Sequence, residues 1–133
     1  MAVDKPTERA QEALAGAVRA AQDRSHQLVE PEHLLLALLA QREGIVEPLI
    51  EKAGADIEAI RAAAERQVAK RPEVRGAEGN EQLSPAFRRV LRRAGDEAER
   101  MGDEFLSTEH LVIALLGEPS PARDAMVEGG LVH

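Results

Sequence analysis

The sequence repeats itself at a constant offset of 77 residues, and this repeat constrains the fold more than any other feature. The segment Glu32-His33-Leu34 recurs as Glu109-His110-Leu111, and the offset also places Leu14 on Leu91 and Thr7 on Ser84. The match holds without a gap from Thr7 to Glu51. We therefore infer a tandem duplication within a single domain at residues 1–133, with repeat one at 7–71, a polar, glycine-bearing linker at 72–82 and repeat two at 83–133.

The apolar residues predict helices in both repeats. Alanine and leucine dominate, and Phe87 and Phe105 are the only aromatic residues among 133. Such a composition favours closely packed helices over a β-sandwich or barrel. The predicted fold is all-α, with about four helices in each of two pseudo-twofold-related repeats.

The helix boundaries follow from capping and stop residues. Thr7 and Ser84 are expected to be N-caps, and Pro85 suits the first position of its helix. Repeat one is expected to have helices at about 7–24, from 31, at 46–52 and at 56–71; repeat two, at about 84–102, from 108 and within 121–129. A fourth helix is missing from repeat two, so we expect the chain to be a fragment of a longer protein.

Charge and composition exclude several classes of function. The net charge of −7 argues against nucleic-acid binding, which needs a positive field. The absence of cysteine excludes disulfides and thiolate chemistry. No apolar run approaches the roughly 18 residues of a membrane span, and no signal peptide opens the chain. We expect a cytoplasmic protein that does not enter a membrane.

No catalytic or metal-binding pattern is present. The chain contains neither a G-x-x-x-x-G-K phosphate loop nor a G-x-S-x-G nucleophile motif. His33 and His110 lack a second ligand four residues later, so packed histidines are expected in place of a metal site. We predict a binding module without a cofactor of its own.

The duplicated motifs resemble a known family. Val29 to Leu39 (VEPEHLLLALL) and Leu106 to Leu116 (LSTEHLVIALL) resemble the double Clp N-terminal domain, which precedes the ATPase rings of AAA+ unfoldases and disaggregases. Within the family, the segment 25–33 (SHQLVEPEH) is most similar to the ClpB disaggregase type. The resemblance implies a parent protein that binds ATP and forms a homohexamer.

The resemblance also implies a role and a set of site residues. In this family the N-terminal domain captures unfolded or aggregated polypeptide, or an adaptor protein, for the ATP-driven ring. The substrate-binding residues implied for this chain are Thr7, Leu91, Asp103, Glu109 and His110. Glu32 is a possible second site, of the kind that receives phosphorylated arginine in ClpC-type domains, although Pro31 replaces the hydroxyl residue expected there.

Structural roles are an alternative for the same residues. Thr7 caps a helix, and Glu32 and Glu109 suit the positive ends of their helices. Together with the resemblance, which places Leu91 and His110 beside an apolar groove, this leads us to expect that the two repeats pack through their first helices and leave such a groove at the surface. An alternative function is that of an adaptor-docking or regulatory domain of a ClpC- or ClpA-type protease unfoldase.

Overall fold

The computed structural model describes residues 3–76 and 79–131 and confirms the all-α class. Its elements are α1 (Glu8–Asp23), β1 (Leu28–Val29), α2 (Pro31–Ala40), α3 (Val46–Lys52), α4 (Ile57–Ala69), β2 (Gln82–Leu83), α5 (Pro85–Arg100), α6 (Thr108–Gly117) and α7 (Pro121–Glu128). These helices lie where the sequence predicts them. Residues 77–78 of the predicted linker and 132–133 of repeat two lie outside the described residues. None of the described helices is long and apolar enough to cross a membrane.

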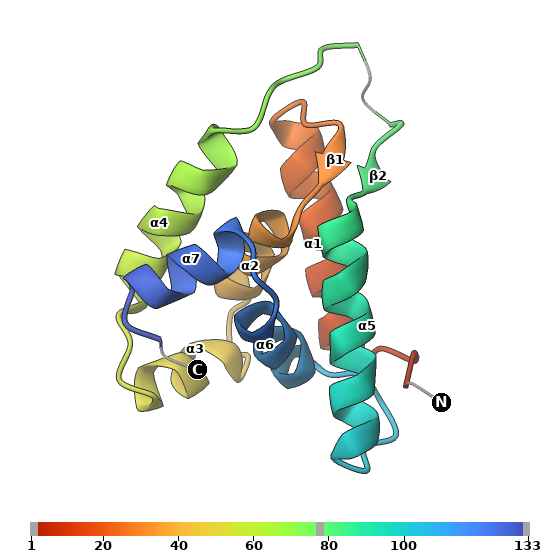
Figure 1. The fold of residues 1–133 in the computed structure, drawn as a ribbon, viewed down its shortest axis with the longest axis vertical. Coiled ribbons are helices and arrows are strands. Elements are labelled where there is room, and N and C mark those ends of the chain that lie inside the picture. Colours follow the sequence, from red (N-terminus) through yellow and green to blue (C-terminus); the bar gives the residue numbers. More distant parts are fainter. Residues whose placement is uncertain (1–2, 77–78, 132–133) are drawn as a thin grey trace.

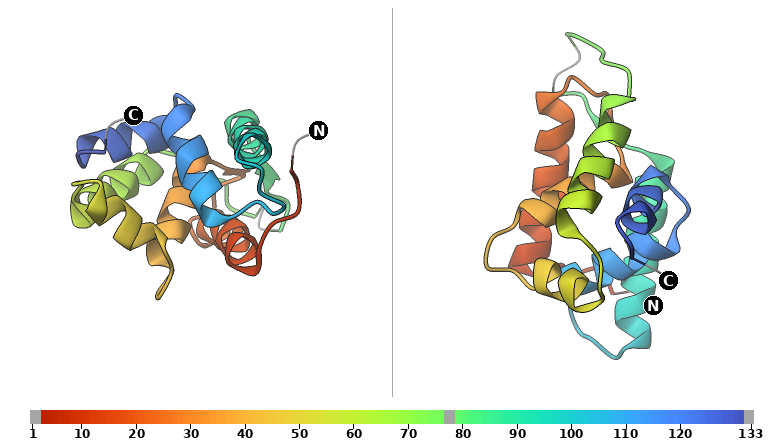
Figure 2. Two further views of the ribbon diagram at one scale, coloured as in Figure 1. Left: turned by 90° about the horizontal axis from the view of Figure 1, so that it is seen from below. Right: turned by 90° about the vertical axis from the view of Figure 1, so that its left-hand side faces the viewer.

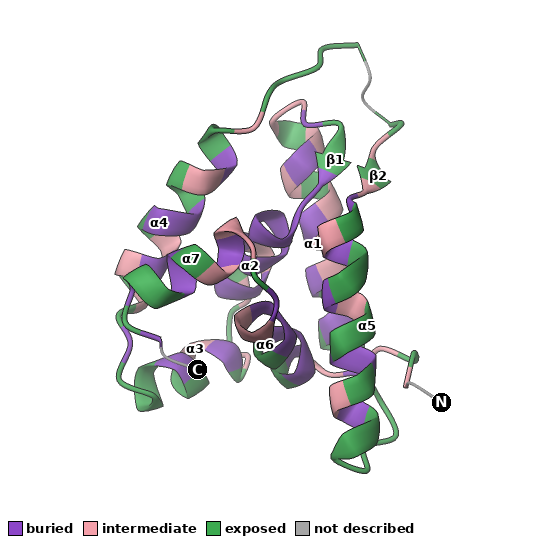
Figure 3. Ribbon diagram, viewed as in Figure 1, coloured by how far each residue is buried: buried purple, intermediate pink, exposed green. Residues whose placement is uncertain are grey.

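The two central helices, α2 and α6, carry much of the core (Figures 1 and 3). Both have apolar residues on most sides, and Leu34, Leu35 and Leu111 are fully buried. The amphipathic helices α1 and α5 each pack on the central helix of their own repeat. Thr7 caps α1 by accepting a hydrogen bond from the Ala10 N–H, and Ser84 caps α5 in the same way, as predicted.

The expectation that the repeats pack through their first helices is wrong. The most extensive packing between repeats joins α4 to α7, and α1 and α5 are not among the helix pairs in broad contact (Figure 2). Small residues permit the close approach of α4 and α7. A Cβ atom added to Gly129 would lie 2.2 Å from Ile60 Cγ1. The sequence alone does not reveal which helices of two similar repeats meet.

Two short parallel pairings, absent from the sequence-based prediction, tie the repeats together. In the first, β1 pairs with β2, with Val29 opposite Leu83. In the second, Pro6 pairs with Leu106. Because Leu106 is the counterpart of Val29 at the 77-residue offset, and Leu83 is that of Pro6, the two pairings are related by the internal repeat. Each repeat thus provides a strand beside the segment that precedes the first helix of the other.

Repeat two has counterparts of α1, α2 and α3 among the described residues, but none of α4. In repeat one, Leu36 on α2 is only 9 % exposed, whereas its counterpart Ile113 on α6 is 38 % exposed. Likewise Met126 on α7 is buried where α7 packs against α4, while its counterpart Leu49 on α3 is exposed. The apolar face formed by α3 and α6 therefore lacks the cover that α4 gives elsewhere.

The close approach of α4 and α7 predicts that the stability of the domain is sensitive to any side chain at position 129. Gly129→Ala should lower the free energy of unfolding by about 1–3 kcal/mol, because the new methyl group overlaps Ile60. Urea denaturation measures the change. Gly44→Ala is the matched control, since its Cβ would lie 3.8 Å from the nearest atom, in Gln41. Equal stability of the two variants would contradict the packing described here.

Candidate functional site

An apolar hollow opens between α1 and α5, where the sequence predicts a groove. Its volume is about 310 Å³, and it is lined by Val3, Asp4, Pro6, Leu14, Leu91, Arg92, Gly95 and Leu106. Leu14 and Leu91, which are counterparts in the repeat, face the hollow from the two helices and are half-buried. The hollow therefore presents aliphatic side chains from both repeats at the protein surface.

A hydrogen-bonded polar cluster lies on the loop that leads into α6. The Ser107 N–H donates to His110 Nδ1 at 2.9 Å, so the other ring nitrogen of His110 carries the proton. His110 Nε2 then donates to Asp103 Oδ2 at 2.8 Å. Two of the predicted site residues are thus joined directly. His110 is buried, whereas the Asp103 side chain is 47 % exposed and presents its second oxygen toward solvent.

Leu106 connects the polar cluster to Thr7 and to the hollow. The Thr7 N–H donates to the Leu106 carbonyl oxygen at 2.9 Å, and the Leu106 N–H donates to the Lys5 carbonyl oxygen at 2.8 Å. Leu106 also lines the hollow beside Leu91. The structure therefore brings Thr7, Leu91 and the Asp103–His110 pair into one region, with the exposed Glu109 next to His110 at the start of α6.

The same motif has a different partner in repeat one. There the Glu30 N–H donates to His33 Nδ1 at 2.8 Å, and His33 Nε2 donates to His26 Nδ1 at 2.9 Å. His26 is the counterpart of Asp103, so one repeat has an imidazole where the other has a carboxylate. Burial lowers the pKa of His33 to about 4. The 77-residue offset contains this substitution, and it is the signal that sequence reasoning overlooked.

Glu32, the possible second site, is placed away from solvent. Its side chain is fully buried, and Oε2 accepts a hydrogen bond from Arg71 Nε at 2.7 Å. Its other oxygen, Oε1, has no hydrogen-bond partner among the described residues. Burial raises the pKa of Glu32, although the Arg71 guanidinium opposes the rise. An external group would have to displace Arg71 to reach Glu32.

Glu109, the counterpart of Glu32, is exposed, and no helix among the described residues covers α6 as α4 covers α2. Arg71 immediately follows α4 and its C-cap, and it supplies the cation that covers Glu32. The corresponding position in repeat two falls beyond residue 133. The two acidic residues of the duplicated motif therefore differ in access: Glu32 is buried beneath Arg71, and Glu109 is exposed.

The basic face of α5 is organised by a buried carboxylate. Arg89 and Arg93 each donate to Glu118 at 2.8 Å, and hydrogen bonds from Arg89 and Arg93 hold the pKa of Glu118 below its usual value. Among the described residues, no group of three or more His, Cys, Asp or Glu side chains is arranged to hold a metal ion.

A model of the Clp repeat (R) N-terminal domain matches residues 5–128 of this chain. The chain belongs to this family. Its resemblance to the double Clp N-terminal domain is therefore confirmed, over most of its length. The matched region includes both copies of the duplicated motif and six of the eight residues that line the hollow, all but Val3 and Asp4.

Curated relatives of the chain are ClpB chaperones. The chain is 38 % identical over 132 residues to ClpB of Propionibacterium freudenreichii, covering 98 % of this chain and 15 % of the relative. It is 41 % identical over 123 residues to ClpB of Nitratidesulfovibrio vulgaris, covering 90 % of this chain and 14 % of the relative. The chain thus spans a small part of the length of the curated relatives it matches.

Solved structures of the family share the fold. The N-terminal domain of Hsp104 from Candida albicans matches with a TM-score of 0.85 at 20 % identity, covering 96 % of this chain and 83 % of that chain. The N-terminal domain of the ClpV1 ATPase from E. coli matches with a TM-score of 0.82 at 28 % identity, covering 98 % and 80 %. Both matches support the helical architecture described above.

The buried His33 predicts a loss of stability in acid. Unfolding restores its ordinary pKa of about 6.5, so the unfolded state takes up a proton that the native state resists down to about pH 4. The contribution of His33 to the free energy of unfolding is fully present above pH 6.5, and it falls by about 2 kcal/mol when the pH is lowered to 5. Urea denaturation at several pH values should therefore give a shallower pH dependence for His33→Asn than for the wild type.

The comparison of variants matters because neighbouring groups also titrate. The lowered pKa of His26 acts in the same direction as that of His33, whereas the raised pKa of Glu32 adds stability as the pH falls. The difference between wild type and His33→Asn isolates the term from His33. Parallel curves for the two proteins would contradict the role assigned to its burial.

The ion pair between Arg71 and the buried Glu32 predicts that substitution of Arg71 strongly lowers the stability of the domain. Arg71→Met should lower the free energy of unfolding at pH 7 by about 3 kcal/mol, because it leaves the Glu32 carboxylate buried without its cation. Arg75→Met is the control, since Arg75 is 87 % exposed and its pair with Glu73 is at the surface. Equal urea midpoints for the two variants would show that Glu32 does not depend on Arg71.

Proposed function

We propose that this domain captures extended segments of unfolded or aggregated polypeptide in the hollow between α1 and α5. The observation that carries this proposal is the hollow itself, in which the half-buried Leu14 and Leu91 present aliphatic surface beside the buried Leu106. An extended client segment would bury its own apolar side chains against them. Apolar contact of this kind has little sequence preference, which suits a site that accepts many clients.

The acidic loop beside the hollow supplies the polar part of the proposed contact. Asp103 keeps one carboxylate oxygen free of His110, and Glu104 and Glu109 are exposed nearby in the sequence. The Thr7 N–H donates to the Leu106 carbonyl oxygen, and the Thr7 hydroxyl oxygen accepts from the Ala10 N–H. The role of Thr7 is therefore to hold this rim in place. We therefore propose clients in which an apolar segment is flanked by basic residues.

The proposal also concerns the protein of which this chain would be part. The ClpB relatives are about seven times longer than this chain, and we propose that an ATP-driven disaggregase ring in the cytoplasm receives the captured segment. In a homohexamer, several weak sites close together would raise the effective concentration of client. One domain therefore needs little affinity, and the chemistry takes place in the ring.

The test measures binding of an unfolded protein to two variants, one with a leucine substituted in the hollow and one with a leucine substituted on α3. Leu91→Gln should weaken binding of reduced, carbamidomethylated lactalbumin by about tenfold, since it removes most of one buried aliphatic contact. Leu49→Gln on α3 is the matched control, because Leu49 is 41 % exposed and lies away from the hollow. Amide shifts of the isotopically labelled domain measure both affinities, and circular dichroism checks that the helices are retained.

The outcomes separate two functions. Loss of binding in Leu91→Gln alone supports capture in the hollow, whereas equal binding by both variants contradicts it. No response to the unfolded probe, together with one stoichiometric folded partner in a pull-down, would favour the adaptor-docking or regulatory function. Shifts confined to Arg88, Arg89 and Arg93 of α5, which do not line the hollow, would also count against it.

A further inference from the structure

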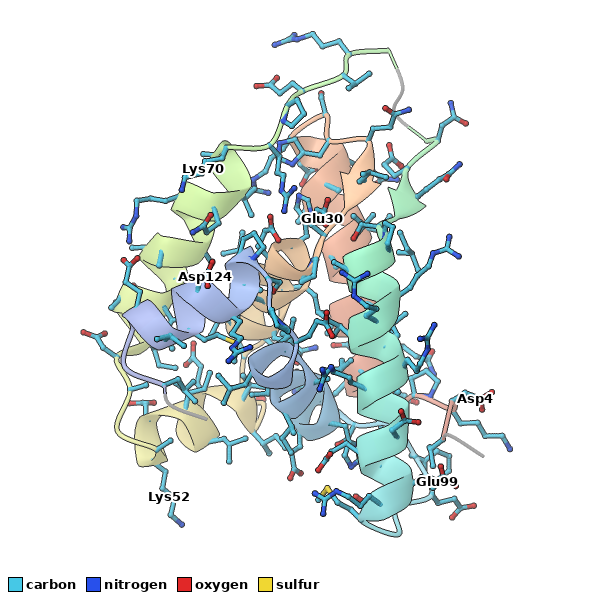
Figure 4. The ribbon with its side chains drawn as sticks, in the orientation of Figure 1. Asp4, Glu30, Lys52, Lys70, Glu99 and Asp124 are labelled. Atoms are coloured by element: carbon cyan, nitrogen blue, oxygen red, sulfur yellow. The ribbon has the colours of Figure 1, made fainter. Side chains whose placement is uncertain are left out.

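The hollow already contains a segment of the protein itself. Residues 3–6 run beside α5, where Asp4 is labelled in Figure 4, and Val3 and Pro6 line the same space as Leu14 and Leu91. Val3 is half-buried and packs against the core. We name residues 3–6 the N-terminal strap. It covers part of the aliphatic surface that a client would use.

Gly95 allows the strap to approach α5 closely. The Val3 N–H donates to the Gly95 carbonyl oxygen at 3.2 Å, although that carbonyl belongs to the middle of a helix. Gly95 is the counterpart of Val18 on α1, and glycine inside a helix is destabilising relative to alanine. Without a side chain at this position, an extended backbone can lie against the helix and donate to it.

The two ends of the strap are held unequally. At its C-terminal end, Lys5 and Thr7 exchange two backbone hydrogen bonds with Leu106, at 2.8 and 2.9 Å. At its N-terminal end, Val3 has one longer hydrogen bond and a half-buried side chain, and the intervening Asp4 is exposed. Val3 can therefore leave the hollow while the pairing with Leu106 remains intact.

We propose that Val3 is a resident, displaceable occupant of the client site, and that the strap shows how a client binds. The client would be an extended polypeptide segment that places an aliphatic side chain against Leu14 and Leu91 and donates a backbone N–H to the Gly95 carbonyl. The proposal rests on the proposed function and extends it in two ways. It defines the client's conformation, and it makes the strap a competitor that lowers apparent affinity.

The test removes the Val3 side chain from the wall of the hollow and keeps Leu14 and Leu91 in place. Val3→Asp expels the side chain from the aliphatic surface, and it should tighten binding of reduced, carbamidomethylated lactalbumin by about tenfold if the strap occupies the site for about nine-tenths of the time. Val74→Asp is the matched control, because it introduces the same charge at an exposed valine in the 72–82 segment. In the wild type, client binding should also shift the Val3 amide and increase its hydrogen exchange.

The outcomes distinguish this inference from the function on which it rests. Unchanged or weaker binding by Val3→Asp, relative to Val74→Asp, would overturn the competitor role of the strap. A Val3 amide that stays protected in the client complex would overturn it too. If Leu91→Gln binds the probe as well as the wild type does, the hollow itself is not the client site, and the proposed function fails with the inference.

Discussion

The exchange of backbone pairing between the two repeats positions everything else in this domain. Leu106 of repeat two accepts from Thr7 and donates to Lys5, while Val29 of repeat one accepts from Ser84. Each pairing therefore fixes the N-cap of a first helix to the other repeat. Because α1 and α5 make little direct contact, these short pairings set their separation. These pairings act together with the packing of α1 and α5 on the central helices, and they hold the two helices on either side of the hollow.

Duplication provided two copies of one motif, and small differences gave them different properties. Both copies place a histidine in the first turn of a central helix, where it accepts from the N-cap backbone. The next contact separates them, because His33 meets another histidine and His110 meets the exposed Asp103. Glu32 is closed off by Arg71, whereas Glu109 faces solvent. In repeat one, Glu32 and His33 are thus buried against internal partners, whereas Asp103 and Glu109 of repeat two are exposed.

The sequence predicts the helices well because their signals are local. Caps such as Thr7 and Ser84, and the 77-residue offset, place each helix within a residue or two. The strands were missed because two-residue pairings leave no periodicity, and their stability comes from partners far along the chain. The packing of α4 on α7 and the cover of Glu32 by Arg71 were missed for the same reason. Leu91, Asp103 and His110 were named from a resemblance, and the contacts among them required the fold.

The pairing of Lys5 and Thr7 with Leu106 has a consequence for how the domain is made. These partners are separated by about 100 residues, so Lys5 and Thr7 leave the ribosome well before Leu106 can pair with them. At about 5–20 residues per second, the wait is roughly 5–20 seconds. During this time α1 has no partner helix across the hollow, and the face of α1 that carries Leu14 is exposed to solvent. A domain proposed to bind unfolded chains is thus itself incompletely folded during its synthesis. Its docking surface is completed only after Leu106 has emerged from the ribosome.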